Sequence, residues 1–120
     1  MAKPYTRSTV LPIYDVGFHL VLSDSEADAC PVLRRLLGAS IDPKDPYSCA
    51  FFPGEKDFAI SLIRGRIEPG DIAHETYHLA HHVLNRAGIF SLKKNQEPFA
   101  YLQGYVVNCI YKWLGVVTHK

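Results

Sequence analysis

The sequence predicts an α+β fold, in which a small antiparallel or mixed sheet of about three strands packs against helices. One strand is expected at Val16–Ser23, where apolar side chains alternate with others. A hairpin is expected from Tyr47–Phe52 and Asp57–Ile63, two runs rich in aromatic and β-branched residues that flank a short segment with Pro and Gly. In the second half of the chain, apolar residues recur at helical spacing in two long segments, which predicts two helices after the sheet.

The strand Val16–Ser23 has two different faces. Because successive side chains of a strand point to opposite sides, the larger apolar residues share one face and His19 lies on the other. His19 is therefore expected to be exposed. The apolar face consists of Val16, Phe18, Leu20 and Leu22.

A helix is expected directly after this strand. Ser23, followed three residues later by Glu26, is a capping-box pattern, in which the serine side chain accepts a hydrogen bond from a backbone N–H of the first turn. The helix would run from Ala27 to Gly38, since glycine commonly ends helices. Pro31 lies inside this range, so the helix is expected to begin late or to bend there.

Two stronger helices are expected in the second half of the chain. The first follows Asp71, a favoured N-cap residue type, and is stopped by Gly88 just beyond its C-terminus. The second begins at Glu97, with Pro98 in its first turn, where proline is tolerated. Its apolar stripe consists of Phe99, Leu102, Val106, Cys109, Ile110, Trp113 and Leu114.

Length, composition and charge exclude several classes of function. The 120 residues fit one domain, and 48% hydrophobic with 21% charged residues is typical of a soluble globular protein. A net charge of +1 does not favour nucleic-acid binding, which depends on a basic excess. No apolar run reaches the roughly 18 residues of a membrane-spanning helix, so no membrane contact is expected. The oligomeric state stays open.

The cysteines indicate a reducing compartment. Cys30, Cys49 and Cys109 are odd in number and far apart, and no Cys-x-x-Cys pair occurs. The N-terminus lacks the apolar core of a signal peptide. We therefore expect free thiols and a cytoplasmic location.

The segment His74–His78 reads H-E-x-x-H. Residues four apart on a helix project from one face, one turn above the other, so the imidazoles of His74 and His78 can reach one ion. Zinc suits such a pair, with Zn–N bonds of about 2.0–2.1 Å. Glu75 comes directly after the first histidine, a position from which its carboxylate can act as general base on zinc-activated water.

A metal-free alternative is a solvated face of the same helix. Such a face would show the same periodicity, but it usually consists of Lys, Glu and Gln rather than of four histidines. The composition of the stripe therefore favours a metal site. Its members are His74, His78, His81, His82 and Asn85.

Two histidines do not complete a catalytic zinc site, which usually has three protein ligands and one open position. The best candidate for the third ligand is Glu97, 19 residues after His78 at the start of the next helix. Two antiparallel helices would let the side with Glu97 and Tyr101 face the histidines. Alternatively, Glu97 only stabilises the positive end of the helix dipole. Tyr101 could stabilise an oxyanion through its phenol, or could simply pack and donate a hydrogen bond.

Together, HETYHLAHH and NQEPFAYLQGY resemble the zincin metallopeptidases of the gluzincin type, in which a glutamate on the next helix completes an H-E-x-x-H site. Within these, the segments are most similar to small ImmA/IrrE-like and prophage-encoded peptidases, whose helix often reads H-E-x-x-H-x-x-x-H, with His82 as the last histidine here. The resemblance implies a minimal zincin-like fold, a zinc ion held by His74, His78 and Glu97, and a peptide or protein substrate.

His82 separates two functions that the sequence leaves open. As a proton donor to a leaving group it would accompany a catalytic zinc, whereas as a fourth ligand it would close the site and make the zinc structural. The first function is a zinc-dependent hydrolase, a peptidase with Glu75 as base. The second is a non-catalytic, zinc-stabilised binding protein, with a phage or mobile element as its candidate origin. In the first, the predicted hairpin could offer a peptide substrate a strand edge.

Overall fold

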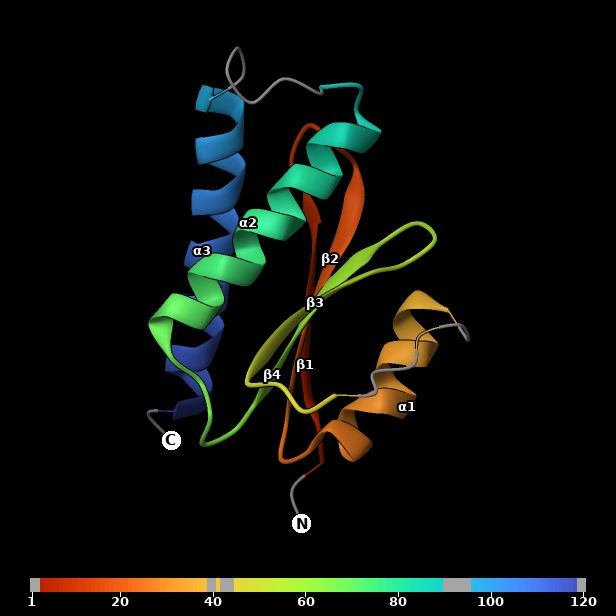
Figure 1. The fold of residues 1–120 in the computed structure, drawn as a ribbon, viewed down its shortest axis with the longest axis vertical. Helices are drawn as coiled ribbons and strands as arrows, with labels where there is room; N and C mark the ends of the chain where they lie inside the picture. The colour runs from red at the N-terminus through yellow and green to blue at the C-terminus, as the bar shows by residue number, and fades with distance from the viewer. Residues whose placement is uncertain (1–2, 39–40, 42–44, 90–95, 119–120) are drawn as a thin grey trace.

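The computed structural model describes residues 3–38, 41, 45–89 and 96–118. Within these residues the chain forms a four-stranded sheet and three helices (Figure 1), so the predicted α+β class is confirmed with one strand more than expected. The elements are β1 (Tyr5–Leu11), β2 (Val16–Ser23), α1 (Glu26–Leu37), β3 (Cys49–Pro53), β4 (Phe58–Ile63), α2 (Pro69–Arg86) and α3 (Gln96–Thr118).

The sheet is mixed, with the strand order β1-β2-β4-β3. β1 pairs antiparallel with β2, and β3 pairs antiparallel with β4, which confirms the predicted hairpin. The two central strands β2 and β4 are parallel, so the chain crosses over between them through α1 and β3. Every residue of β4 is buried, as expected for a central strand with helices on both faces.

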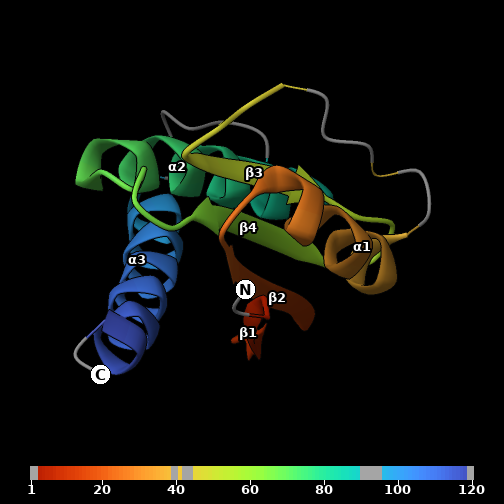
Figure 2. The ribbon, with the colours of Figure 1, turned by 90° about the horizontal axis from the view of Figure 1, so that it is seen from below.

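Helices cover both faces of the sheet (Figure 2). α1 packs against the face that carries Val21 and Ala59. α2 and α3 pack against the opposite face, which carries Phe18, Leu20 and Leu22. The alternation predicted along Val16–Ser23 is therefore confirmed, because its two faces belong to two separate clusters of buried side chains.

β1 was not among the predicted strands. It is an outer strand, and most of its residues are exposed or only partly buried. Its sequence YTRSTVL therefore lacks the alternation of apolar and polar residues that reveals a half-buried strand. Its β-branched Thr and Val residues are the only local signal for it.

The start of α1 differs from the prediction. The N-cap is Ser25, whose side chain accepts from the N–H of Asp28 at 3.1 Å, whereas the Ser23 hydroxyl donates to the carbonyl of Ser25. The predicted capping box of Ser23 and Glu26 is therefore wrong, because the N-cap lies two residues later. The helix begins at Glu26 and continues through Pro31, so the alternative of a late start is wrong.

The start of α2 also differs, whereas its end is as predicted. The N-cap is Glu68, not Asp71, and the carboxylate of Asp71 accepts instead from the Ser48 hydroxyl at 2.7 Å. At the C-terminus, Gly88 has φ +84°, and its N–H donates to the carbonyl of Asn85. The next N–H, of Ile89, donates back to Leu84, which completes a Schellman motif.

The apolar stripe predicted for α3 is confirmed. Five of its seven residues are buried, and Trp113 stacks on Phe18 of β2 with ring centroids 5.7 Å apart. Cys109 and Trp113 are partly buried against the same core. The five buried residues of the stripe are Phe99, Leu102, Val106, Ile110 and Leu114.

Among the described residues, no helix is both long and apolar enough to cross a membrane.

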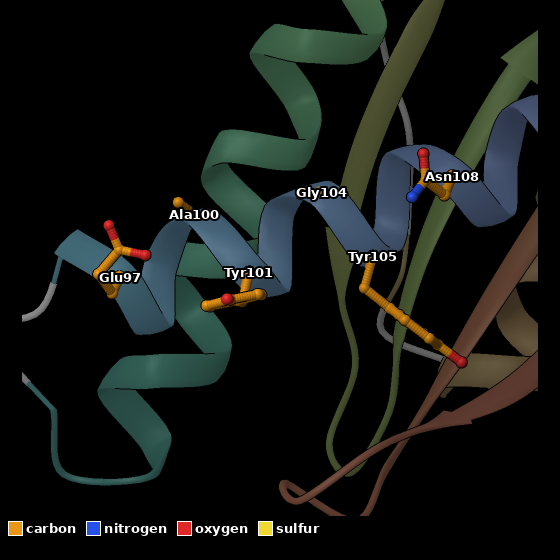
Figure 3. Close-up of a pocket in the computed structure, with 6 residues that line it drawn as sticks. All are labelled: Glu97, Ala100, Tyr101, Gly104, Tyr105 and Asn108. Atoms are coloured by element: carbon orange, nitrogen blue, oxygen red, sulfur yellow. The ribbon is translucent and has the colours of Figure 1, made fainter.

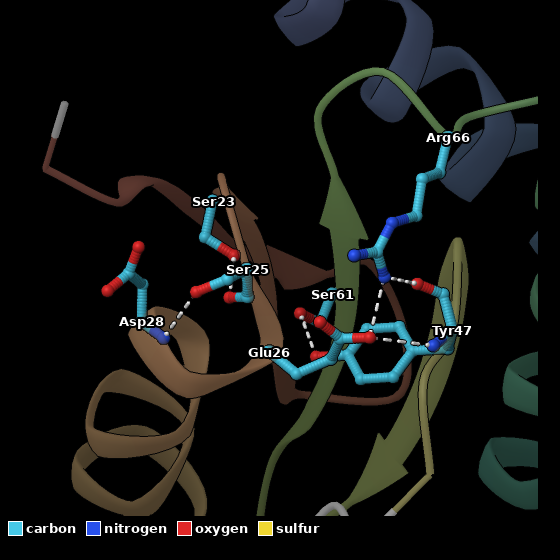
Figure 4. A network of polar contacts seen from close by, with 7 residues as sticks. All are labelled: Ser23, Ser25, Glu26, Asp28, Tyr47, Ser61 and Arg66. Atoms are coloured by element: carbon cyan, nitrogen blue, oxygen red, sulfur yellow. Dashed lines mark hydrogen bonds and ion pairs between the residues drawn. The ribbon is translucent and has the colours of Figure 1, made fainter. Parts of the chain in front are cut away.

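A polar network holds the N-terminus of α1 to the strand hairpin (Figure 4). One carboxylate oxygen of Glu26 accepts from Arg66 at 2.6 Å and from the N–H of Tyr47 at 3.1 Å. The Tyr47 phenol lies 2.8 Å from the hydroxyl of Ser61 on β4. Hydrogen bonds from its own backbone N–H and from Arg66 hold the pKa of Glu26 below its ordinary value of 4.5.

Glu26→Gln is expected to lower stability at neutral pH and to lose this effect in acid. Since the pKa of Glu26 is lowered in the folded state, its contribution is present above pH 4.5 and disappears as the pH falls through the lowered pKa. Urea unfolding midpoints of the wild type and the variant at pH 7 and at pH 3 measure this. Glu55→Gln, at an exposed position between β3 and β4, is the control. The prediction would be contradicted if the midpoints of Glu26→Gln and the wild type differed equally at both pH values.

Candidate metal centre

α2 lies along the outer strand β3. Side chains spread over about four turns of α2 bind it to this strand and to the residues that flank it. Near its start, Asp71 accepts from the Ser48 hydroxyl at 2.7 Å. One turn later, Glu75 accepts from the N–H of Phe51 at 2.7 Å. Near its end, Arg86 donates to the carbonyl of Gly54 at 2.7 Å, and its guanidinium lies 4.5 Å from the centre of the Phe58 ring. These contacts position the whole H-E-x-x-H segment.

His74 and His78 point to the same spot beside this contact. Their Nε2 atoms are 3.1 Å apart, and the rings meet edge to face with centroids 4.8 Å apart. Two nitrogens that each bind one tetrahedral zinc ion at about 2.0–2.1 Å would be about 3.3 Å apart. The observed separation is therefore close to that of two ligands on one ion. It is also short enough for a hydrogen bond between the two imidazoles when one nitrogen carries a proton.

Glu75 has one oxygen bound and one facing the histidines. Its Oε1 accepts from the Phe51 N–H, and its Oε2 lies 3.6 Å from Nε2 of His74. The Glu75 side chain is 19% exposed, whereas that of His74 is 68% exposed. Because the bond to β3 restricts the carboxylate, its free oxygen is directed to the place where an ion shared by the histidines would lie.

These three side chains form a group able to hold a metal ion. One candidate ligand atom from each of His74, Glu75 and His78 lies within 4.8 Å of the others, and it is the only such group in the described part of the chain. The prediction that His74 and His78 converge is therefore confirmed as geometry. Their binding of zinc stays a prediction.

Glu97 and Tyr101 lie elsewhere. Figure 3 shows them on one side of α3, where with Tyr105 they line a shallow hollow of about 430 Å³. Tyr101 is 76% exposed. Glu97 is not a member of the group formed by His74 and its neighbours. The full lining of the hollow is Glu97, Ala100, Tyr101, Gly104, Tyr105 and Asn108.

The side of α3 that faces α2 explains this separation. Gln103 donates to the carbonyl of Ala73 at 3.1 Å, so the middle of α3, not its start, lies level with the first ligand. Glu97 is six residues before Gln103, which is about 9 Å along a helix axis. Near its start, α3 instead contacts α2 through Phe99, whose ring centroid lies 5.0 Å from that of Tyr77. The side of α3 that faces α2 is therefore not the one that carries Glu97.

His82 also lies outside the group, next to the aromatic residues of the hairpin. Its ring centroid is 5.1 Å from that of Phe51 and 6.4 Å from that of Phe58. Burial, followed by the positive charge of Arg86, lowers the pKa of His82. His82 therefore contacts the rings of the hairpin, and its nitrogens are not among the atoms that could share an ion with His74.

Cys49 lies in the core near the carboxylates of α2. Burial, more than the charges of Glu75 and Asp71, raises the pKa of its thiol to about 12. The thiol is therefore protonated at neutral pH and packs as an apolar group. All three cysteines are free thiols, as predicted.

The role of β3 in the site was not visible in the sequence. The motif predicts a base in Glu75, but nothing local to Phe51 shows that its backbone N–H would hold this carboxylate. The only available signal was the helical spacing of Asp71, Glu75, His82 and Arg86, which marks a second polar stripe beside the histidines. This stripe is the one that faces β3.

No protein-family model matches the chain, and no curated protein and no solved structure is significantly similar to it. What the site does must therefore be inferred from its own residues.

Proposed function

We propose that this protein is a zinc-dependent hydrolase in which His74 and His78 bind the ion and Glu75 is the general base. The observation that carries this proposal is the convergence of the two Nε2 atoms, 3.1 Å apart, with the free oxygen of Glu75 at 3.6 Å from one of them. The H-E-x-x-H spacing predicts this arrangement, and the contact of α2 with β3 maintains it.

The donor set fits a zinc ion with open positions. Imidazole nitrogen is an ordinary zinc donor, and a structural zinc site is usually closed by four protein ligands. Of the three members of the group in the described residues, only the exposed His74 and His78 are ligands in this proposal, because Glu75 is the base. An exposed, incomplete site leaves room for water and substrate, which favours catalysis over a purely structural ion.

The residues would divide the chemistry of hydrolysis between them. Zinc, when bound, supplies a Lewis acid that polarises a carbonyl and makes water more acidic. Glu75 would accept the proton of the attacking water on its free oxygen and pass it to the leaving nitrogen of a peptide. The Phe51 N–H would hold the other oxygen and keep the carboxylate in place. A substrate strand cannot pair with that N–H unless Glu75 releases it, so strand addition at this point of β3 would require this hydrogen bond to break.

A non-catalytic zinc-binding protein is the second candidate. It is favoured by the same bond between Glu75 and Phe51, because a carboxylate that fastens α2 to β3 has a structural purpose without any reaction. In this case zinc would stabilise the fold, and no bond would be cut.

The deciding experiment measures zinc content and hydrolysis on the same preparation. We expect one zinc per chain by elemental analysis, and zinc-dependent cleavage of labelled casein or of a library of internally quenched peptides. Stoichiometric zinc without cleavage of either probe would overturn the hydrolase and leave the binding protein. A chain that takes up no zinc from a buffered zinc solution would exclude both.

Glu97→Gln is expected to leave zinc affinity unchanged, because Glu97 lies on the side of α3 that carries Tyr101 and outside the group of His74. Competition with a chromophoric chelator measures the affinity. Glu68→Gln, at the N-cap of α2, is the matched surface control. A loss of 10-fold or more for Glu97→Gln alone would instead show that Glu97 is the third ligand, as its resemblance to the gluzincin glutamate implies.

A further inference from the structure

A second group of catalytic residue types lies on the sheet, away from the histidines of α2. Ser8 on β1 and His19 on β2 are directly opposite each other, and the Ser8 hydroxyl lies 2.6 Å from Nδ1 of His19. The other ring nitrogen, Nε2, lies 3.0 Å from a carboxylate oxygen of Asp57, just before β4. The three side chains therefore form a continuous chain of hydrogen bonds from serine to histidine to aspartate.

The chemistry of the aspartate determines the direction of these hydrogen bonds. An ionised carboxylate only accepts, so the proton of neutral His19 must be on Nε2, where it is donated to Asp57. The lone pair of Nδ1 is then directed to Ser8, whose hydroxyl donates to it. This is the order of a nucleophile, a base and a group that orients the base.

The surrounding structure holds the aspartate in place. Its second oxygen accepts from the N–H of Gly17 at 3.0 Å. A Cβ atom at Gly17 would lie 2.6 Å from the same carboxylate, so only glycine leaves room for Asp57 there. The hydrogen bond from His19 is the largest of the effects that lower the pKa of Asp57. Asp57 is therefore charged at neutral pH and fixed at two points.

His19 is shielded whereas Ser8 is accessible. The side chain of His19 is only 13% exposed, so the expectation of an exposed histidine is wrong, because Ser8 and Asp57 cover both of its nitrogens. Ser8 is exposed on β1, an outer strand of the sheet. Alternate N–H groups of an outer strand are not used by the sheet, and such groups are of the kind that stabilises an oxyanion.

We propose that Ser8 is an activated nucleophile that accepts acyl or phosphonyl groups from activated esters, with His19 as its base and Asp57 as the residue that orients the base. This site is independent of the zinc site, and its substrate class is small esters able to reach an open sheet surface. No zinc ion takes part in it.

The proposed reaction is a two-step ester hydrolysis. The Ser8 oxygen forms a bond to the carbonyl carbon while its proton moves to Nδ1 of His19. The ester C–O bond then breaks, and the leaving alcohol takes that proton. Water, deprotonated by the same nitrogen, attacks the acyl-serine, and the acid is released as Ser8 regains its proton. With a fluorophosphonate probe the first step forms an O–P bond, releases fluoride, and stops there.

The test uses the full chain in EDTA, so that the histidines of α2 carry no metal. A fluorescent fluorophosphonate is added, and the labelled residue is identified by peptide mass spectrometry. We expect Ser8 to be labelled on the order of 100-fold faster than Ser48, a serine whose hydroxyl donates directly to a carboxylate with no histidine between them. Ser8→Ala should abolish the fast labelling, and Ser48→Ala should leave it unchanged.

Asp57→Asn separates activation from mere exposure. This variant retains Ser8 and His19 but removes the charge that orients the base, so labelling of Ser8 should slow by at least 10-fold. Circular dichroism and thermal unfolding establish that each variant is folded. Equal labelling rates for Ser8 and Ser48 in the wild type, or an unchanged rate in folded Asp57→Asn, would overturn the proposal and show that the three residues only join β1, β2 and the start of β4.

Discussion

Glu75→Gln is expected to abolish peptide hydrolysis and to leave zinc binding intact. A general base typically contributes on the order of 10²–10⁴-fold to the rate, and an amide cannot accept the proton of the attacking water. The substitution nevertheless retains an oxygen that can accept from the Phe51 N–H, so α2 should stay bound to β3. The measurement combines cleavage of internally quenched peptides with zinc content on the same sample.

Glu75→Ala is the companion variant, because it removes both the base and the acceptor. It leaves the partly buried Phe51 N–H without its partner, and a hydrogen bond to a charged group contributes about 1.5–3 kcal/mol. We therefore expect loss of hydrolysis in both variants but loss of stability chiefly in Glu75→Ala. Full hydrolysis by Glu75→Gln would contradict the assignment of the base. Equal destabilisation by both would show that the charge of Glu75, not its oxygen, secures the helix.

His74→Ala and His78→Ala are each expected to weaken zinc binding by about 100-fold or more. Structural zinc sites with four ligands bind with about 10–16 kcal/mol, so one ligand corresponds to roughly 2.5–4 kcal/mol. Both side chains are exposed, so their removal leaves the core unchanged and the fold should persist. Chelator competition gives the affinities, and thermal unfolding of the metal-free variants gives their stability.

His81→Ala is the matched control for the ligand variants. His81 belongs to the same histidine-rich stripe and is exposed, but it lies outside the group of converging atoms and stacks near Tyr77. Its removal should leave zinc affinity within about 3-fold of the wild type, less than any change that follows the loss of a ligand. If His81→Ala weakens binding as much as His74→Ala, zinc is held diffusely by a histidine-rich surface, and no defined site exists.

The elements that could be predicted were those with strong local patterns. The alternation in β2, the hairpin of β3 and β4, and the Gly88 terminus of α2 are all encoded within a few neighbouring residues. The start of α1 and the strand β1 were not predicted correctly. Ser23 and Ser25 compete for the N-cap of α1, and the exposed β1 has no periodicity that its own sequence could reveal.

In the candidate site, too, the features that depend on neighbouring residues were predicted, and those that depend on distant ones were not. His74 and His78 converge because residues four apart share a helix face, so their spacing alone was sufficient. The position of Glu97 depends on which side of α3 faces α2, and the sequence of one helix does not show which neighbour each of its sides contacts. The partner of Glu75 was equally hidden, because it is a backbone N–H whose identity does not depend on the side chain of Phe51.

By itself, the sequence therefore determined the α+β class, the helical H-E-x-x-H pair and the face on which these histidines lie. Only the tertiary structure decided that Glu75 is held by β3, that Glu97 and Tyr101 lie apart from the histidines, and that Ser8, His19 and Asp57 meet. The physical reason is the range of the contacts. Helix periodicity acts over four residues, whereas the bonds of His19 to Ser8 and to Asp57 span 11 and 38 residues and exist only once the strands have paired.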